Sequence, residues 1–352
     1  MAEPRKAEVV PLAEARSRRP RRKSRRPSSF EERLKALEED VDQALAATGA
    51  GVATERSVAE ALESVLDGYA RLARAIGSAD PIEALAKLLA GRSVAEVDPF
   101  GHDRAYEESV APLFRALYRA WWRVDTQGIE SVPAAGRALL VGNHSGGVFA
   151  YDGAMLKVAL MDEHPAHRDA RPLVDDFVYR LPFIGNFMTR CGGVRASMQN
   201  AERLLRQEQA VVVFPEGTKG IGKPFDQRYR LARFGRGGFV RLALRTGAPI
   251  VPIAIVGGEE IHPILARWDW LARQVGLPYF PITPTFPWLG LLGLVPLPSK
   301  WRIEFGQPFD WSSYGPKAAD DRILVSRLTE EVRRRIQQML VGALDRRGPA
   351  FF

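Results

Sequence analysis

Cysteine and long apolar runs are scarce in this chain of 352 residues, which contains one cysteine, Cys191. A single cysteine excludes an internal disulfide framework and indicates a reducing compartment. The first thirty residues are charged rather than apolar, so we expect no secretory signal. No uncharged run of about eighteen apolar residues predicts a straight membrane-spanning helix.

Two common classes of site are excluded by what their motifs lack. Histidine, cysteine and carboxylate residues do not cluster at metal-ligand spacing; His164 and His167 are close together without a third ligand, so we expect no metal. Residues 217–223 match G-x-x-x-x-G-K, the start of a phosphate-binding P-loop. The next residue is Pro224, which lacks the hydroxyl group that would bind magnesium, and we exclude a nucleoside triphosphatase.

The rest of the composition is that of a soluble globular protein with a basic N-terminus. Hydrophobic residues make up 46% of the chain and charged residues 26%, and the length allows a sizeable core. The net charge is +8, and eight of the eleven residues from Arg16 to Arg26 are Arg or Lys. Because residues 1–28 are also poor in aromatic side chains, we expect a disordered polybasic tail. Such a tail binds nucleic acid, anionic lipid or nothing specific.

Hydrophobic periodicity divides the chain after the tail into three parts. A capping box at Ser29–Glu32 opens the first of three amphipathic segments, and residues 29–99 are expected to form a small helical module. Residues 100–315 alternate strands with helices, which predicts an α/β domain with a mostly parallel mixed sheet flanked by helices. Residues 316–352 end in an Arg-rich helix. Strands are expected at 138–142, 171–174, 210–214 and 250–256, and helices at 103–122, 152–161, 200–207, 237–246 and 325–344.

The strongest chemical signal follows the first of these strands. The apolar run ends at Gly142 and is followed by His144 and, at an expected helix start, by Asp152. An imidazole takes up a proton near neutral pH, and a carboxylate fixes its tautomer and stabilises its charged form. A histidine in a turn is more often structural, but this pair is also the pattern of a general base with an orienting partner.

Four blocks in this region share a pattern with a known family. They are Asn143–His144 with Asp152, Gly185–Arg190 with Arg195 beyond it, Phe214–Thr218, and Ile250–Ile253. In this order they resemble the PlsC-like glycerolipid acyltransferases, which include the 1-acylglycerol-3-phosphate (lysophosphatidate) acyltransferases. The string Phe214–Thr218 is the most specific of the four. The resemblance covers residues 100–310 and implies the α/β fold expected from periodicity.

The resemblance also implies a role for each block. His144 would take the proton of an alcohol as the alcohol attacks a thioester, and Asp152 would orient His144. Glu216 does not bind phosphate directly and is expected to hold a glycerol hydroxyl or an arginine. The acceptor site would combine a guanidinium group, which suits phosphate, with the third block: Arg190 or Arg195, and Phe214, Pro215, Glu216, Gly217 and Thr218. Surface cations and a strand-end cap are the alternative interpretations of the two arginines and Glu216.

One spacing departs from the family pattern. The family usually has four residues between the histidine and the aspartate, whereas Ser145 to Tyr151 make seven here. Gly146 and Gly147 give this longer loop room to return Asp152 to His144. The departure bears on the role of Asp152 and on lysophosphatidate as the acceptor more than on acyl transfer itself.

Two segments admit more than one interpretation. The helix at 103–122 ends in an aromatic cluster, Tyr118, Trp121 and Trp122, beside three arginines, which is typical of a membrane interface and equally of a core helix. Residues 279–298 carry no charge but five prolines, which do not suit a straight spanning helix. We expect this stretch to face a bilayer, to guide an acyl chain, or to be buried under the sheet.

These features predict a membrane-peripheral acyltransferase on the cytoplasmic face of the membrane. It would move a fatty acyl group from acyl-CoA or acyl carrier protein to a lysophospholipid or related glycerolipid, with no permanently bound cofactor. The tail is then expected to bind the anionic lipid surface rather than nucleic acid, because each basic residue contributes about 1 kcal/mol there.

Two other classes stay open. A lipid ester hydrolase would use Ser145, because residues 143–147 resemble a G-x-S-x-G nucleophile elbow without its first glycine. A non-catalytic lipid-binding module would keep the fold without turnover.

Overall fold

The core of the fold is a seven-stranded sheet with the order β1-β9-β6-β2-β5-β3-β4. In this computed structural model, which describes residues 97–181, 184–275 and 277–351, all pairings in the sheet are parallel except that of β6 with β9. The expected mostly parallel mixed sheet flanked by helices is confirmed. The expected tail, and the helical module except for its last residues, lie outside the described residues. The strands are β1 (Asp125–Gln127), β2 (Ala138–Gly142), β3 (Ala170–Val174), β4 (Val194–Arg195), β5 (Ala210–Val213), β6 (Ile250–Val256) and β9 (Arg302–Phe305).

Strand β2 lies at the centre of the sheet, between β5 and β6. Its register places Leu140 opposite Val212 of β5 and opposite Val251 of β6. All residues of β2 and β6 are buried. Because helices cover both faces of a parallel sheet, its inner strands are continuous apolar runs, which explains why the sequence predicted them.

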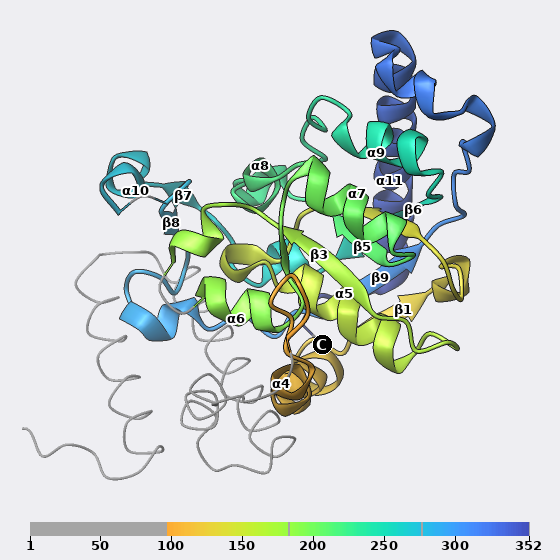
Figure 1. Cartoon of the computed structure of the whole chain (residues 1–352). Helices are drawn as coiled ribbons and strands as arrows, with labels where there is room; N and C mark the ends of the chain where they lie inside the picture. Colours follow the sequence, from red (N-terminus) through yellow and green to blue (C-terminus); the bar gives the residue numbers. More distant parts are fainter. Residues whose placement is uncertain (1–96, 182–183, 276, 352) are drawn as a thin grey trace, which may run out of the picture. The chain divides into compact units, whose positions relative to one another are not determined.

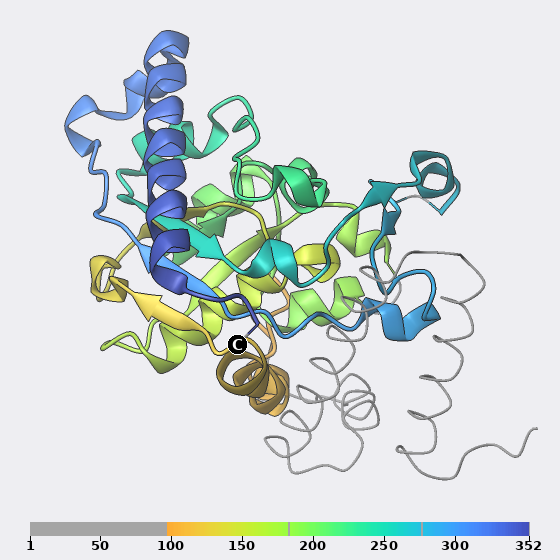
Figure 2. The same cartoon turned by 180° about the vertical axis from the view of Figure 1, so that it is seen from behind.

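Helices form one layer on each face of the sheet (Figures 1 and 2). Alternate side chains of β2 point to opposite layers: Leu139 and Val141 belong to one apolar cluster and Leu140 to the other. The first cluster contains residues of α7 (Met198–Arg206), α9 (Gly238–Thr246) and α11 (Arg322–Arg347); the second contains residues of α4 (Arg104–Ala116), the π-helical turn η2 (Leu117–Trp121) and α5 (Tyr151–Asp162). The long C-terminal helix is therefore part of the α/β core.

The aromatic cluster at the end of the first helix is a core feature. Trp121 and Trp122 are 1% and 0% exposed, and their indole N–H groups donate to the carbonyl oxygens of Pro296 and Leu297. The Trp122 ring stacks on Trp301. Full burial of such a side chain contributes about 1.5–3 kcal/mol to folding. The alternative interpretation of these tryptophans as membrane-interface residues is wrong, because their rings are enclosed by the protein.

The uncharged stretch at 279–298 forms a loop with short elements. Strand β8 (Pro281–Ile282) pairs with β7 (Ala266–Arg267), and η8 (Gly290–Leu294) follows. Tyr279 and Leu297 are buried, whereas Trp288 between them is 73% exposed. The helix α10 (Asp269–Val275) projects beside this pair of strands (Figure 1). Among the described residues, no helix has both the length and the apolar character needed to cross a membrane.

Candidate active site

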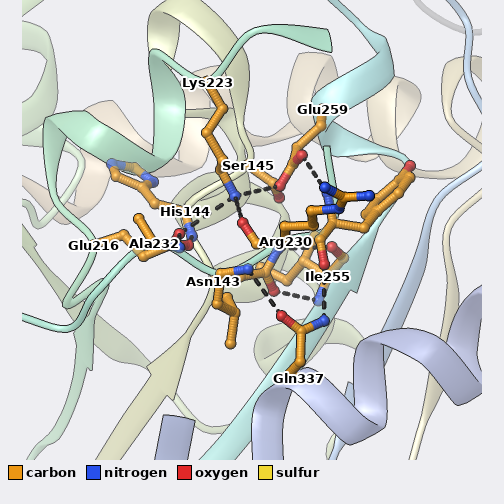
Figure 3. Close-up of polar contacts among 12 residues, drawn as sticks. Asn143, His144, Ser145, Glu216, Lys223, Arg230, Ala232, Ile255, Glu259 and Gln337 are labelled. Atoms are coloured by element: carbon orange, nitrogen blue, oxygen red, sulfur yellow. Dashed lines mark hydrogen bonds and ion pairs between the residues drawn. The ribbon is translucent and has the colours of Figure 1, made fainter. Parts of the chain in front are cut away.

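The site begins where β2 ends at the carboxyl edge of the sheet. Asn143, the first residue after the strand, is buried, and its side chain spans to β6. Its amide nitrogen donates to the Ile255 carbonyl oxygen at 2.9 Å, and its amide oxygen accepts from the Ile255 N–H at 2.8 Å (Figure 3). This paired contact fixes the direction in which the chain leaves the strand, and it therefore places the next residue, His144.

The His144 ring contacts Asp152 directly. Nδ1 of His144 lies 2.7 Å from Oδ2 of Asp152, and the Asp152 side chain is fully buried. The same carboxylate oxygen accepts from the backbone N–H groups of Ser145 at 2.8 Å and Gly146 at 3.0 Å, while Oδ1 accepts from that of Gly153. Asp152 thus fixes both the ring and the turn that carries it. The loop of seven residues returns the carboxylate to His144 despite its unusual length.

Two glycines make this return possible. A Cβ atom at Gly146 would lie 2.4 Å from the backbone nitrogen atoms of Tyr151 and Asp152. Gly147 has a positive φ of 66° and lies against the ring of His262. A side chain at Gly146 would clash with the returning chain and one at Gly147 with His262, so the loop requires glycine at both.

The acidity of Asp152 follows from its contacts. Burial by itself would raise the pKa of this carboxyl group, but the positive charge that the His144 ring can carry and the hydrogen bonds from the ring and the two amides lower it. The net result is a pKa below the usual range of an aspartate. Asp152 is therefore ionised at neutral pH and accepts the Nδ1–H of His144, which leaves Nε2 of the ring as its proton-accepting atom.

An apolar cavity of about 160 Å³ opens beside the His144 ring. Phe214, the residue after β5, stacks on the ring at a centroid distance of 4.5 Å and forms part of the wall. Other lining residues come from the end of β3, the turn η5 (Val178–Arg180), α6 (Ile184–Arg190) and α8 (Thr218–Ile221) with the residue before it; they include Leu173, Val178, Met188, Gly217, Thr218 and Ile221. A second apolar cavity, of about 130 Å³, shares Gly153, Pro172 and Met188 with the first. The histidine thus stands at the wall of a space suited to a hydrocarbon chain.

Glu216 supports the backbone of the histidine. Its side chain is buried; Oε1 accepts from the His144 N–H at 3.0 Å, and Oε2 accepts from the Ala232 N–H at 2.6 Å. Oε2 also lies 3.3 Å from the ammonium group of Lys223 (Figure 3). Glu216 was expected to hold a glycerol hydroxyl or an arginine. The cation that it contacts in the structure is a lysine, Lys223. Pro215 lies beside this contact, and its carbonyl oxygen accepts from the Gly235 N–H.

The two candidate arginines lie in different surroundings. Arg190, at the end of α6, is 3.1 Å from the buried carboxylate of Asp103 and lies over the ring of Tyr106. Arg195 ends β4 opposite Val174, which lines the first apolar cavity, and its side chain is 66% exposed. Its ion pair with Asp176 lies on the surface. The structure thus places Arg195 near the cavity rim and Arg190 in a partly buried ion pair.

Three further observations bear on the chemistry. Ser145 is 1% exposed, and its hydroxyl oxygen lies against Gly258 with no hydrogen-bond partner among the described residues. His102, Glu107 and Asp169 bring potential metal ligands together in the described part of the chain. The Lys157 ammonium group contacts both of these carboxylates, at 2.5 and 3.1 Å, and so supplies the cation there.

Sequence reasoning missed Lys223 and its second carboxylate partner, Glu259. Lys223 stood in the P-loop match, where it was set aside with the rejected motif. Glu259 follows β6 in the turn η7 (Gly258–Glu260) and belongs to none of the four blocks. No sequence pattern marks either residue, because Lys223 lies beyond α8 and Glu259 is one of two adjacent glutamates after β6.

Comparisons with known proteins cover this region. The family model described as Acyltransferase matches residues 123–256, which contain all four blocks. An uncharacterized protein of Mycobacterium tuberculosis (strain ATCC 25618 / H37Rv) is 44% identical over 99% of this chain and 98% of its own length. The human DGAT1/2-independent enzyme synthesizing storage lipids is 21% identical over 66% of this chain and 65% of its own length.

Among solved structures, a 1-acyl-sn-glycerophosphate acyltransferase, PlsC, from Thermotoga maritima is similar to this chain with a TM-score of 0.40 and 18% identity. The match covers 73% of this chain and 87% of that one.

Proposed function

Because the chain belongs to the PlsC-like glycerolipid acyltransferase family, we propose that His144 is the general base of its acyl transfer to a lysophospholipid hydroxyl. The protein is an acyltransferase of lipid metabolism. The acyl donor in this proposal is the thioester of coenzyme A or of acyl carrier protein. The observation that carries it is the His144–Asp152 contact at the wall of an apolar cavity.

In the proposed reaction, the His144 ring first accepts a proton and then gives it back. As the acceptor hydroxyl oxygen bonds to the thioester carbonyl carbon, its proton passes to Nε2 of His144. The charged ring is stabilised by ionised Asp152 through Nδ1–H. The tetrahedral intermediate then expels the thiolate as the carbon–sulfur bond breaks, and the thiolate takes the proton from Nε2. The products are the ester and the free thiol, and the enzyme returns to its starting state.

The substrates in this proposal follow the chemistry of the walls. The fatty acyl chain lies in the apolar cavity beside Phe214. The phosphate of a lysophosphatidate acceptor meets Arg195, whose exposed guanidinium group has donors beyond those used on Asp176. Arg190 is less suited to this role, because its charge is already matched by buried Asp103.

Peripheral binding to the cytoplasmic face of a membrane is also part of the proposal. Trp268, Trp270 and Trp288 are 55%, 68% and 73% exposed, and Leu265 beside β7 is 62% exposed. Indole rings favour the interface of a bilayer, and Arg267 near them carries a charge that attracts anionic lipid. These side chains belong to the β7–β8 pair, α10 and the uncharged loop, not to the helix that the sequence suggested.

The hydrolase alternative has little support from the geometry. Its nucleophile would be Ser145, whose hydroxyl oxygen is buried against Gly258. A serine nucleophile must reach the acyl carbon and needs a base within hydrogen-bond distance. The His144 ring instead uses its Nδ1 on Asp152.

A substrate panel tests the proposal. Purified protein is given labelled acyl-CoA or acyl carrier protein, with lysophosphatidate or a neutral monoacylglycerol as acceptor. We expect an ester product, and we expect Arg195→Gln to raise the KM for lysophosphatidate about tenfold or more, because a charge-assisted hydrogen bond is worth about 1.5–3 kcal/mol. The KM for the neutral acceptor should not change, and Arg245→Gln serves as the matched control. Absence of ester product with every donor and acceptor would instead favour a lipid-binding module.

A further inference from the structure

The ammonium group of Lys223 contacts three oxygen atoms close to the backbone of His144 (Figure 3). Its ammonium group is 3.3 Å from Oε2 of Glu216, 3.0 Å from Oε1 of Glu259 and 3.1 Å from the carbonyl oxygen of Arg230. The side chain is only 8% exposed, and those of both glutamates are 7% exposed or less. The ammonium group donates hydrogen bonds to Glu259 and to the Arg230 carbonyl oxygen and forms an ion pair with Glu216.

The other ends of these contacts are fixed to separate parts of the fold. Glu259 Oε2 accepts from the Tyr229 N–H at 2.7 Å. The loop around Arg230 is held by Gln337 of α11, which donates to the Tyr229 carbonyl oxygen and accepts from the Leu231 N–H (Figure 3). The ammonium group is therefore positioned by the turn after β6 and by α11, and not by the loop from His144 to Asp152.

Glu216 is the link between this set and His144. It has one oxygen on the His144 N–H and the other on Lys223 and the Ala232 N–H. Burial raises the pKa of Glu259, the Lys223 ammonium group opposes this rise, and the negative charge of Glu216 adds to it. Without the ammonium group, two buried carboxylates would repel each other.

We propose that Lys223 and Glu259 are positioning residues that hold Glu216 against the backbone of His144. The inference rests on the proposed function, because its consequence is the placement of the His144 ring relative to the acyl carbonyl carbon. Gly220 of α8 packs against Cβ of His144, so the histidine is enclosed between this support and Asp152. A displacement of about 1 Å at a reacting group can cost about a hundredfold in rate.

The test is Lys223→Met, which keeps the apolar stem and removes the charge, beside Lys317→Met at an exposed site as control. We expect Lys223→Met to lower kcat about tenfold to a hundredfold. Its KM for donor and acceptor should stay within about twofold, because neither substrate touches Lys223 in this account. Lys317→Met should match the wild type in both constants.

A second variant separates positioning from general destabilisation. In Lys223→Met, Glu259 loses the ammonium group that lowers its pKa, so kcat should fall as Glu259 ionises with rising pH, in a new titration absent from the wild type. Lys223→Met/Glu259→Gln removes one carboxylate charge together with the ammonium charge. This double variant should regain part of the kcat that the single variant loses, and it should lose the new titration. If the single variant does not fold, the double variant alone is decisive, with kcat about threefold to tenfold below wild type at unchanged KM.

Two results would overturn the inference. One is a wild-type kcat and pH profile in Lys223→Met, or in the double variant where the single variant does not fold. The other is a loss of kcat that follows a lowered Tm and is not recovered by Glu259→Gln. The proposed function fails differently, because it predicts that His144→Ala abolishes transfer. Loss of transfer in His144→Ala with normal kcat in the Lys223 variants would contradict the positioning role alone.

Discussion

The carboxylate of Asp152 contacts the ring of His144 although seven residues separate them in the sequence. One oxygen atom of Asp152 accepts from Nδ1 of the ring and from the two backbone amides that follow the histidine. The long loop therefore does not weaken the pair, because the turn closes onto the same carboxylate that orients the ring. A charged, fully buried acceptor at this position fixes both the tautomer and the orientation of the imidazole.

Replacement of Asp152 by asparagine should reduce acyl transfer about a hundredfold or more, because the ring loses its fixed tautomer and the charge that stabilises imidazolium. The variant keeps the volume of the side chain, so KM should change little. Steady-state kinetics with labelled acyl-CoA measures both constants, and exposed Asp345→Asn is the matched control. Wild-type turnover in Asp152→Asn would show that the carboxylate is only structural.

The stability of the protein should decrease as the pH is lowered, because of the buried side chain of His262. This side chain is buried next to Gly147, and burial lowers its pKa to about 4 from an ordinary value of 6.5. Between these values the unfolded chain binds a proton at His262 that the folded chain does not, so the free energy of unfolding falls as the pH is lowered through this window. Denaturant unfolding at several pH values measures the slope.

The His262→Gln variant should show a smaller slope than the wild type between about pH 6.5 and 4. His167→Asn, at an exposed histidine with positive φ, is the control and should keep the wild-type slope. An unchanged slope in His262→Gln would mean that this histidine is not buried in its neutral form.

The exposed tryptophans should carry membrane binding. Conversion of Trp268, Trp270 and Trp288 to alanine is expected to weaken sedimentation with phosphatidylglycerol vesicles about tenfold or more, because burying each large apolar side chain contributes about 1.5–3 kcal/mol. A variant with Tyr314, Ile323 and Val341 changed to alanine removes exposed apolar side chains elsewhere and should bind like the wild type. Equal binding by all three proteins would contradict the assigned surface.

A buried ion pair joins the C-terminal helix to the turn after β6. Arg347 lies 2.7 Å from Glu260, whose oxygens also accept from the hydroxyl groups of Tyr229 and Ser299. Arg347→Met should lower the free energy of unfolding by about 3–5 kcal/mol, because Glu260 would remain as a buried charge without its cation. The neighbouring Arg346→Met removes a half-exposed guanidinium group from Glu304, which keeps Arg302 as its cation, and should change stability little. Chemical denaturation of both variants measures the difference, and equal stabilities would contradict this account.

The sequence predicted the features that depend on local patterns. β2 and β6 are buried on both faces, so their apolar runs alone were sufficient to recognise them. His144 and Glu216 were found because each comes shortly after an apolar strand, β2 and β5 respectively, within a family block. Parallel strands end at one edge of the sheet, which brings these residues together.

Other features depend on contacts that a linear pattern does not encode. The tryptophans at 121 and 122 lie beside arginines in the sequence, as in an interface helix, and only their packing against Trp301 and the loop carbonyl groups makes them core residues. Lys223 and Glu259 are 36 residues apart, and their pairing follows from the order of β5 and β6 on either side of β2. The placement of Arg190 beside Asp103 also depends on how α6 packs against α4.

The central claim is that His144 is the base of an acyl transfer, and one assay tests it directly. Purified wild-type protein and His144→Ala are incubated with labelled acyl-CoA and lysophosphatidate, and the labelled ester and free fatty acid are separated and counted. The account predicts ester from the wild type and at least about a hundredfold less from His144→Ala, with an unchanged fold. Equal ester formation by both proteins, or labelled fatty acid as the product in place of ester, would contradict it.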